Sequence, residues 1–189
     1  GCTSCAVMCP TGAIAGEINL SGLKADSKQA DRKIMEAIRD AGAKINITEQ
    51  SIIVSRDKLK AFSFDATHCP DLFPPLVALA AHCSGETIIK GVGRLVHKES
   101  NRAAALTTEM SKLGVEISID NDNMIINGPC LLHGNTVDSH NDHRIAMAAA
   151  TVILPTDNQE VIINNAECVA KSYPSFYEDL KQIGGCVDE

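Results

Sequence analysis

The chain has 189 residues, of which 44% are hydrophobic but only 3% are aromatic, and it contains no tryptophan. This length allows one large domain or two small ones around an aliphatic core. The formal net charge of −7 disfavours a general nucleic-acid or anionic-membrane binder, because such proteins are usually basic. No apolar run reaches the roughly 18 residues that a membrane span requires.

The start of the chain, Gly1-Cys2-Thr3, has no initiator Met and none of the basic and apolar segments of a secretion signal. We therefore expect a cytoplasmic protein and a piece of a longer chain. Cys2, Cys5 and Cys9 form C-x2-C-x3-C before Pro10, a partial match to an iron–sulfur motif. Because the other cysteines are scattered, we expect buried or half-buried free thiols in a reducing cytoplasm, and an iron–sulfur electron carrier is the alternative.

The first predicted unit covers about residues 1–58 and begins with a helix of small residues. The strand Glu17–Leu20 follows, and then the amphipathic helix Ser27–Ala41, after which Gly42 suits a helix C-cap. Two further strands are expected at Lys44–Ile47 and Ser51–Val54. The apolar stripe of the amphipathic helix consists of Ala30, Ile34, Ala37, Ile38 and Ala41.

The second unit, about residues 59–128, repeats this order. A small-residue helix containing Ala78–Ala81 leads to the strand Glu86–Ile89 and to the helix Asn101–Leu113, which ends at Gly114. The expected apolar stripe of that helix consists of Ala104, Ala105, Thr108 and Leu113. The closing strands are Glu116–Ile119 and Met124–Ile126, joined by a turn at Asn121-Asp122-Asn123.

The third unit, about residues 129–189, contains the small-residue run Ala146–Ala150 and the strand Glu160–Ile163, and stops near a helix at Gly184-Gly185. A spacing of roughly 70 residues suits a supersecondary unit better than a solenoid repeat. The chain contains no linker rich in Pro, Gly or Ser. We therefore predict the α/β (α+β) class and one globular domain, residues 1–189, with three α-β-α-β-β units around small-residue inner helices.

Two segments combine a helix start with an arginine: Lys98-Glu99-Ser100-Asn101-Arg102 and Asn141-Asp142-His143-Arg144. Helix N-termini attract anions through free N–H groups and the helix dipole. Arginine adds two-point contact with a carboxylate or phosphate. Two such starts predict a site for a small polyanion.

Four segments give the chain a family resemblance: Cys69-Pro70-Asp71, Arg94 to Arg102, Asn141 to Met147, and Ala170 to Pro174. In this order and spacing they resemble the C-terminal half of the 5-enolpyruvylshikimate-3-phosphate synthase family (3-phosphoshikimate 1-carboxyvinyltransferases). The resemblance implies one domain of the enolpyruvyl transferase inverted α/β barrel. It also implies transfer of the enolpyruvyl group of phosphoenolpyruvate to the 5-hydroxyl of shikimate 3-phosphate, in chorismate and aromatic amino-acid biosynthesis, without a metal or cofactor.

The resemblance also implies roles for two acids and two cations. Asp71 would accept a proton and contact shikimate 3-phosphate, and Glu99 would protonate the methylene carbon of phosphoenolpyruvate. Lys98 and Arg94 would contact the shikimate ligand. From the residues alone, Asp71 could equally be a helix N-cap, and Lys98 and Glu99 a solvated charge pair.

Arg102, Arg144 and Lys171 would hold phosphoenolpyruvate, which carries a carboxylate and a phosphate. The alternative is an ion pair between Arg102 and Glu99 and an ordinary surface role for Lys171. Asp142 and His143 would support these binding groups rather than react.

The chain departs from the family in two places and in length. Asn101 stands where the family commonly has Asp, and Gly1 to Cys5 replaces an acidic helix opening. The N-terminal domain that completes the cleft is absent, so the fragment alone should bind ligands poorly and show no useful turnover. The open alternatives are a UDP-N-acetylglucosamine enolpyruvyl transferase and a non-catalytic phosphometabolite-binding domain, for which Glu99 would be superfluous.

Overall fold

The structure is a computed structural model that describes residues 2–22, 29–96, 98, 101–156 and 159–188. Its elements in chain order are α1 (Cys2–Ala15), β1 (Glu17–Ser21), η1 (Ala30–Lys33), α2 (Ile34–Asp40), β2 (Lys44–Ile47), β3 (Ser51–Ser55), β4 (Ser63–Asp65), η2 (Pro70–Leu72), α3 (Phe73–Ala80), β5 (Gly85–Lys90), η3 (Val92–Leu95), α4 (Arg102–Ser111), β6 (Ile117–Asp120), β7 (Asn123–Gly128), β8 (Thr136–Asp138), α5 (His143–Val152), β9 (Ile162–Asn164), η4 (Ala166–Lys171) and α6 (Phe176–Gln182). The η elements are short 3₁₀-helices.

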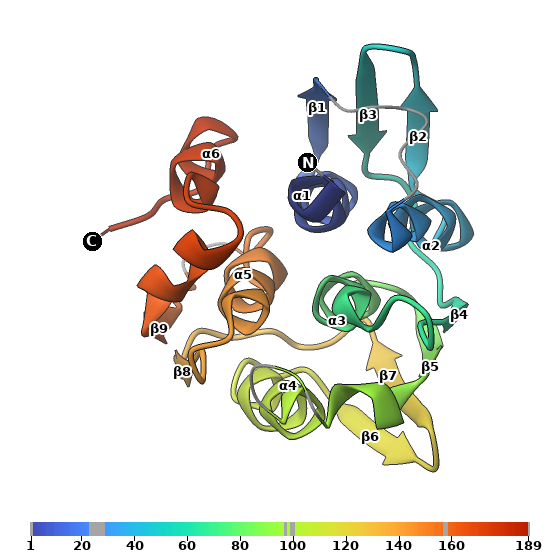
Figure 1. The fold of residues 1–189 in the computed structure, drawn as a ribbon, viewed down its shortest axis with the longest axis vertical. Coiled ribbons are helices and arrows are strands. Elements are labelled where there is room, and N and C mark those ends of the chain that lie inside the picture. The colour runs from blue at the N-terminus through green and yellow to red at the C-terminus, as the bar shows by residue number, and fades with distance from the viewer. Residues whose placement is uncertain (1, 23–28, 97, 99–100, 157–158, 189) are drawn as a thin grey trace.

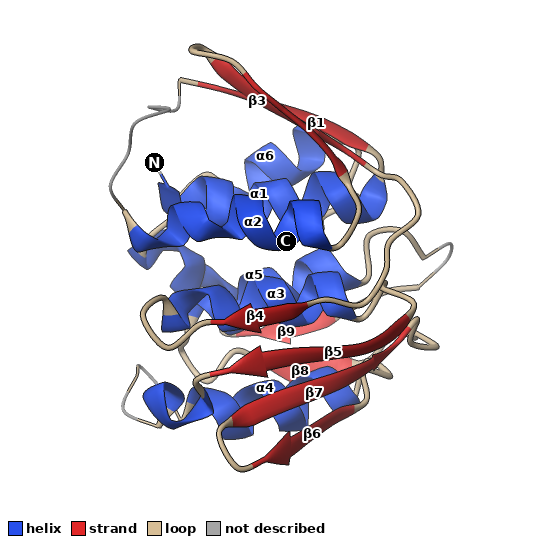
Figure 2. Ribbon diagram, turned by 90° about the vertical axis from the view of Figure 1, so that its right-hand side faces the viewer, coloured by secondary structure: helices blue, strands red, loops and turns tan. Residues whose placement is uncertain are grey.

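Three small-residue helices, α1, α3 and α5, pack against one another in the middle of the molecule (Figure 1). Every residue of α3 and α5 is buried. The helices α2, α4 and α6 lie farther out, with the strands at the periphery, and Figure 2 shows the helices running side by side between the strands. Alanine at the inner positions permits this close approach of helix backbones, which confirms the predicted inner helices.

The strands form three sheets with the orders β1-β3-β2, β4-β5-β7-β6 and β8-β9. The pairs β4–β5 and β8–β9 are parallel, whereas the other pairs are antiparallel. The second unit therefore reads β-α-β-α-β-β, with β4 ahead of its inner helix. The strands β4 and β8 were not predicted, because three-residue strands are too short to show an alternating pattern.

The predicted helix Ser27–Ala41 needs correction. Residues 27 and 28 lie outside the described part, and the remainder forms the 3₁₀-helix η1 and the α-helix α2. Four members of the predicted stripe are buried, but Ala30 is exposed. The predicted strand Glu160–Ile163 is also displaced, since β9 begins at Ile162.

The predicted stripe of Asn101–Leu113 was wrong in part, because Ala104 and Thr108 are exposed. The buried face of α4 contains Arg102, Ala103, Ala105, Leu106, Glu109 and Met110. Two charged residues on this face break the apolar pattern, so hydropathy alone could not locate it.

The predicted glycine C-caps are confirmed. Gly42 and Gly114 follow α2 and α4 with left-handed φ angles of 88° and 89°. Over the described ranges, none of the helices is long and apolar enough to cross a membrane.

Candidate active site

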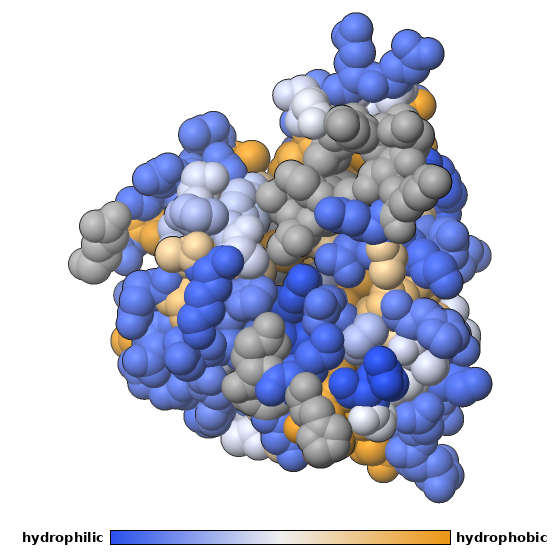
Figure 3. Space-filling view, viewed as in Figure 1, coloured by the Kyte–Doolittle hydropathy of each residue, from blue (hydrophilic) through white to orange (hydrophobic). Residues whose placement is uncertain are grey.

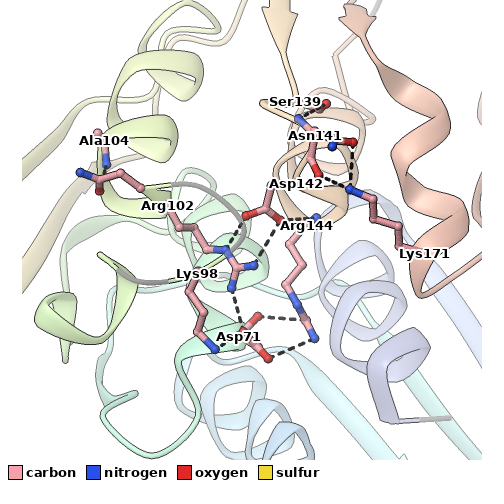
Figure 4. A network of polar contacts seen from close by, with 10 residues as sticks. Asp71, Lys98, Arg102, Ala104, Ser139, Asn141, Asp142, Arg144 and Lys171 are labelled. Atoms are coloured by element: carbon pink, nitrogen blue, oxygen red, sulfur yellow. Dashed lines mark hydrogen bonds and ion pairs between the residues drawn. The ribbon is translucent and has the colours of Figure 1, made fainter.

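Asp71 lies at the centre of a cluster of charged side chains in front of α3. Pro70 and Asp71 form the start of η2, and the helix that follows has no side-chain cap, so Asp71 is not an N-cap residue. The carboxylate instead faces three cations: Lys98 Nζ at 3.0 Å, Arg102 Nη1 at 2.7 Å and Arg144 Nη2 at 3.5 Å (Figure 4). These residues come from separate segments that the fold brings together.

Arg102 joins this cluster to the start of α5. Its Nη1 donates to Asp71 Oδ1, while Nε and Nη2 donate to Asp142 at 2.8 and 3.2 Å. The Arg102 and Asp142 side chains are both fully buried. Because its donors face two carboxylates, Arg102 holds Asp71 and Asp142 in fixed positions relative to each other.

Arg144 has looser charge pairing than Arg102. Its Nη1 donates to the backbone oxygen of Asp71 at 3.1 Å. Its Nη2 lies 3.5 Å from the Asp71 carboxylate and 3.6 Å from that of Asp31. These longer separations leave Nη2 of Arg144 as the guanidinium group of the cluster that is best able to exchange a carboxylate partner for an incoming anion.

Asp31 lies beside Arg144 but was not among the predicted site residues. It stands in the predicted amphipathic helix, where an acidic residue reads as part of a solvated face, and no local motif distinguishes it. Only the packing of η1 beside α1 reveals its place near Arg144.

The pKa values of Asp71 and Asp31, the two acids beside Arg144, are shifted in opposite directions. Burial alone would raise the pKa of Asp71, but Arg144, Lys98 and Arg102 outweigh this and lower the pKa to about 2. The pKa of Asp31 is raised, because burial and the neighbouring Asp71 carboxylate outweigh Arg144 and Lys98. The cluster therefore holds one carboxylate firmly ionised and a second that accepts a proton more readily.

The start of α5 carries the Asn141–Arg144 motif. Asp142 is the N-cap of α5 and accepts from the Arg144 N–H at 3.0 Å, and His143 lies buried in the first turn. Lys171 Nζ donates to the backbone oxygen and to Oδ1 of Asn141 at 2.7 and 2.8 Å (Figure 4). Lys171, at the end of η4, is therefore held against the same loop by two hydrogen bonds to Asn141.

The structure does not bring every predicted residue into this cluster. Arg94 is exposed in η3 and forms no hydrogen bond or ion pair with the described members of the cluster. Glu99 lies outside the described residues. The predicted site residues that the structure brings together are thus Asp71, Lys98, Arg102 and Arg144, with Lys171 and the start of α5 beside them.

Much of the face seen in Figure 3 is hydrophilic, including its centre. Among the described residues, no group of three or more His, Cys, Asp or Glu side chains could hold a metal ion. The geometry offers cations for a carboxylate and a phosphate, and a carboxylate that can accept a hydrogen bond from a hydroxyl.

Comparison with known proteins points to one family. The family model for EPSP synthase (3-phosphoshikimate 1-carboxyvinyltransferase) matches residues 3–180. A 3-phosphoshikimate 1-carboxyvinyltransferase of Clostridium kluyveri is 43% identical over 178 residues, which are 94% of this chain and 42% of that protein. Its counterpart in Clostridium perfringens (strain 13) is 42% identical and is likewise covered to 42%. The chain thus spans less than half the length of these relatives.

Solved structures give the same picture of the fold. An EPSP synthase from Acinetobacter baumannii superposes with a TM-score of 0.85 at 25% identity, covering 98% of this chain and 46% of that one. The enolpyruvyl transferase NikO from Streptomyces tendae superposes with a TM-score of 0.77 at 17% identity, covering 98% and 43%. The predicted α/β fold of one enolpyruvyl transferase domain is therefore confirmed.

Proposed function

We propose that this chain, which belongs to the EPSP synthase (3-phosphoshikimate 1-carboxyvinyltransferase) family, supplies one wall of a cleft that transfers an enolpyruvyl group. The donor would be phosphoenolpyruvate and the acceptor the 5-hydroxyl of shikimate 3-phosphate. The gathering of Asp71, Lys98 and Arg144 from three separate segments is the observation that supports this proposal most directly.

The reaction requires an acid, a base and several cations. The acceptor oxygen adds to C2 of phosphoenolpyruvate as its proton leaves and C3 gains a proton; loss of a proton from the methyl group and of phosphate from C2 then restores the double bond. Asp71 suits the acceptor hydroxyl, because its carboxylate is ionised and half-exposed. We assign the protonation of C3 to Glu99, which lies outside the described residues.

The cations divide into two groups. Arg144 and Lys171 have exchangeable or exposed donors and suit the carboxylate and phosphate of phosphoenolpyruvate. Lys98 and Arg94 would contact the shikimate ligand, as the resemblance implies. The buried Arg102 can reach phosphoenolpyruvate only if its contact with Asp71 is exchanged, so its predicted direct contact requires a rearrangement of this side chain.

We propose that turnover depends on a second domain, which supplies the other wall of the cleft. This chain spans 42% of the Clostridium kluyveri relative, and we propose that an N-terminal domain supplies the remaining contacts to shikimate 3-phosphate. Half a cleft cannot orient two substrates, and orientation provides much of the rate. The buried free thiols Cys69, Cys83 and Cys168 suit a reducing compartment, so we propose a cytoplasmic location.

The test is phosphate release from phosphoenolpyruvate and shikimate 3-phosphate by this chain, alone and assembled with the N-terminal half of the Clostridium kluyveri relative. Release should require both halves. Asp71→Asn and Glu99→Gln should each slow the assembly by about 10² to 10⁴-fold. Lys171→Met should instead raise KM for phosphoenolpyruvate. Association of the halves without any phosphate release would contradict the proposal, as would efficient turnover by this chain alone.

A further pair of measurements separates the alternatives. Replacing shikimate 3-phosphate with UDP-N-acetylglucosamine should abolish phosphate release, whereas the sister transferase would retain it. A non-catalytic binding domain would bind phosphoenolpyruvate equally well in the native chain and in Glu99→Gln, with no release in either assembly.

A further inference from the structure

Glu109 is a buried carboxylate that the proposed reaction does not use. Its side chain is only 2% exposed, and it lies on the inward face of α4, two turns after Arg102. A buried carboxylate is costly unless its oxygens are satisfied. The Glu109 oxygens accept from Lys112 Nζ at 2.7 Å and from the Asp138 N–H at 2.8 Å, and Oε1 lies 3.0 Å from His140 Nε2.

These contacts reach the loop that leads into α5. His140 and Asn141 have φ angles of 51° and 57°, so two successive residues other than glycine adopt the left-handed conformation. Such residues persist only where their surroundings hold them. The loop also closes on itself, since the His140 N–H donates to Asp138 Oδ1 and the Asp142 N–H donates to the Ser139 oxygen.

The same loop presents the groups that contact Lys171, Arg102 and Arg144, the cations proposed to bind phosphoenolpyruvate. The two oxygens of Asn141 receive Lys171, and Asp142 receives Arg102 and caps α5 ahead of Arg144 (Figure 4). Two residues of α4 therefore hold the loop: Glu109 contacts its start, and Arg102 contacts its end. Loss of the Glu109 contacts would release the turn that places Asn141 beside Lys171.

We propose that Glu109 is a positioning residue that fixes the strained turn at His140 and Asn141 and thereby aligns Lys171 and Arg144 for phosphoenolpyruvate. This inference rests on the proposed function. The charge of Glu109 is maintained in the fold: burial would raise its pKa, but Lys112, the Asp138 N–H and His140 lower it below the ordinary value.

The chain offers a matched control for this proposal. Lys112 is the C-cap residue of α4 and contacts the same carboxylate from three residues away, so Lys112→Met disturbs Glu109 without removing a contact to the turn. Glu109→Gln and His140→Phe instead weaken the link between α4 and the turn. A purely structural role for Glu109 would make the three variants alike.

The first readout is hydrogen exchange at the amides of Asp138 and Asp142 in the chain itself. Glu109→Gln and His140→Phe should accelerate exchange there by about tenfold, whereas Lys112→Met should stay within about twofold of the native chain. The double variant Glu109→Gln/His140→Phe should match Glu109→Gln, because Glu109→Gln already weakens the contact that His140→Phe removes. Equal acceleration in Lys112→Met, or none in Glu109→Gln, would overturn the proposal.

The second readout is steady-state kinetics of the two-half assembly. Glu109→Gln and His140→Phe should raise KM for phosphoenolpyruvate about five- to tenfold while changing KM for shikimate 3-phosphate by less than about twofold. Loosened exchange with an unchanged KM for phosphoenolpyruvate would overturn the positioning role and leave the proposed function intact. If the native assembly released no phosphate, the proposed function would fail, and a positioning role for Glu109 in that reaction would fail with it.

Discussion

Arg102 and Asp142, forty residues apart in the sequence, face each other with two hydrogen bonds in the interior, at 2.8 and 3.2 Å, and neither side chain is exposed. This pair joins the start of α4 to the cap of α5. Removal of one partner from a buried pair leaves the other buried charge less compensated, and this costs more free energy than the intact pair contributes.

We expect Asp142→Ala to lower the free energy of unfolding by about 3–5 kcal/mol, since Arg102 then remains buried and α5 loses its cap. Urea unfolding monitored by circular dichroism measures this. Asp57→Asn is the control, because the Asp57–Lys44 pair lies in solvent at 3.2 Å and should leave the unfolding midpoint unchanged. Equal losses in the two variants would show that burial of the pair is not what matters.

Acid should destabilise the chain partly through Asp71. The pKa of Asp71 is about 2 in the folded chain and 3.8 in the unfolded chain. The contribution of Asp71 to the unfolding free energy is therefore complete above pH 3.8 and is lost as the pH falls through the folded pKa. The unfolding free energy of the native chain should therefore decline between about pH 4 and pH 2 more steeply than that of Asp71→Asn. Parallel pH curves for the two proteins would contradict the ionic contacts of Asp71.

The ionised carboxylate of Asp31, unlike that of Asp71, should lower the stability of the folded chain. Its folded pKa is raised, chiefly by burial, so its ionised form is less favourable in the folded chain than in the unfolded chain. Asp31→Asn should raise the thermal midpoint at pH 7, and the gain should vanish as the pH falls below about 3.8, where Asp31 is protonated in both states. A lower midpoint at pH 7 would instead show that the contact with Arg144 outweighs the burial of Asp31.

Gly114 cannot accept a side chain. Its φ is +89°, and a Cβ would lie 2.2 Å from the backbone oxygen of Leu131. Gly114→Ala should therefore cost at least about 2 kcal/mol of unfolding free energy. Gly16→Ala is the matched change, since nothing lies within 4 Å of its added Cβ. Calorimetry of the two variants compares them directly, and similar midpoints would contradict the close approach at Leu131.

The repeated architecture could be predicted because each unit carries its own helix-ending and strand signals in the local sequence. Gly42 and Gly114 end their helices, and alternating strands such as Lys44–Ile47 follow at once. The strands β4 and β8 were not predictable, because their partners lie on other segments and three residues carry no period. Tertiary pairing, not local propensity, makes them strands.

The site was predictable where motifs carried it and unpredictable where only packing does. The side chains of Asp71 and Arg144, which the motifs single out, lie 3.5 Å apart, and their roles stay predictions. Asp31 and Glu109 stand in helices that read as ordinary amphipathic segments, and their partners lie far along the chain. Such pairs form only when one unit packs against the next, and no local sequence pattern encodes that packing.

The meeting of α1, α3 and α5 has an evolutionary corollary. A methyl group added to Ala148, on the inner helix α5, would press on its neighbours rather than on solvent, because this residue is only 2% exposed. A substitution on one inner helix should therefore require compensating substitutions on the other two. Substitutions in the outer strands should need no such compensation.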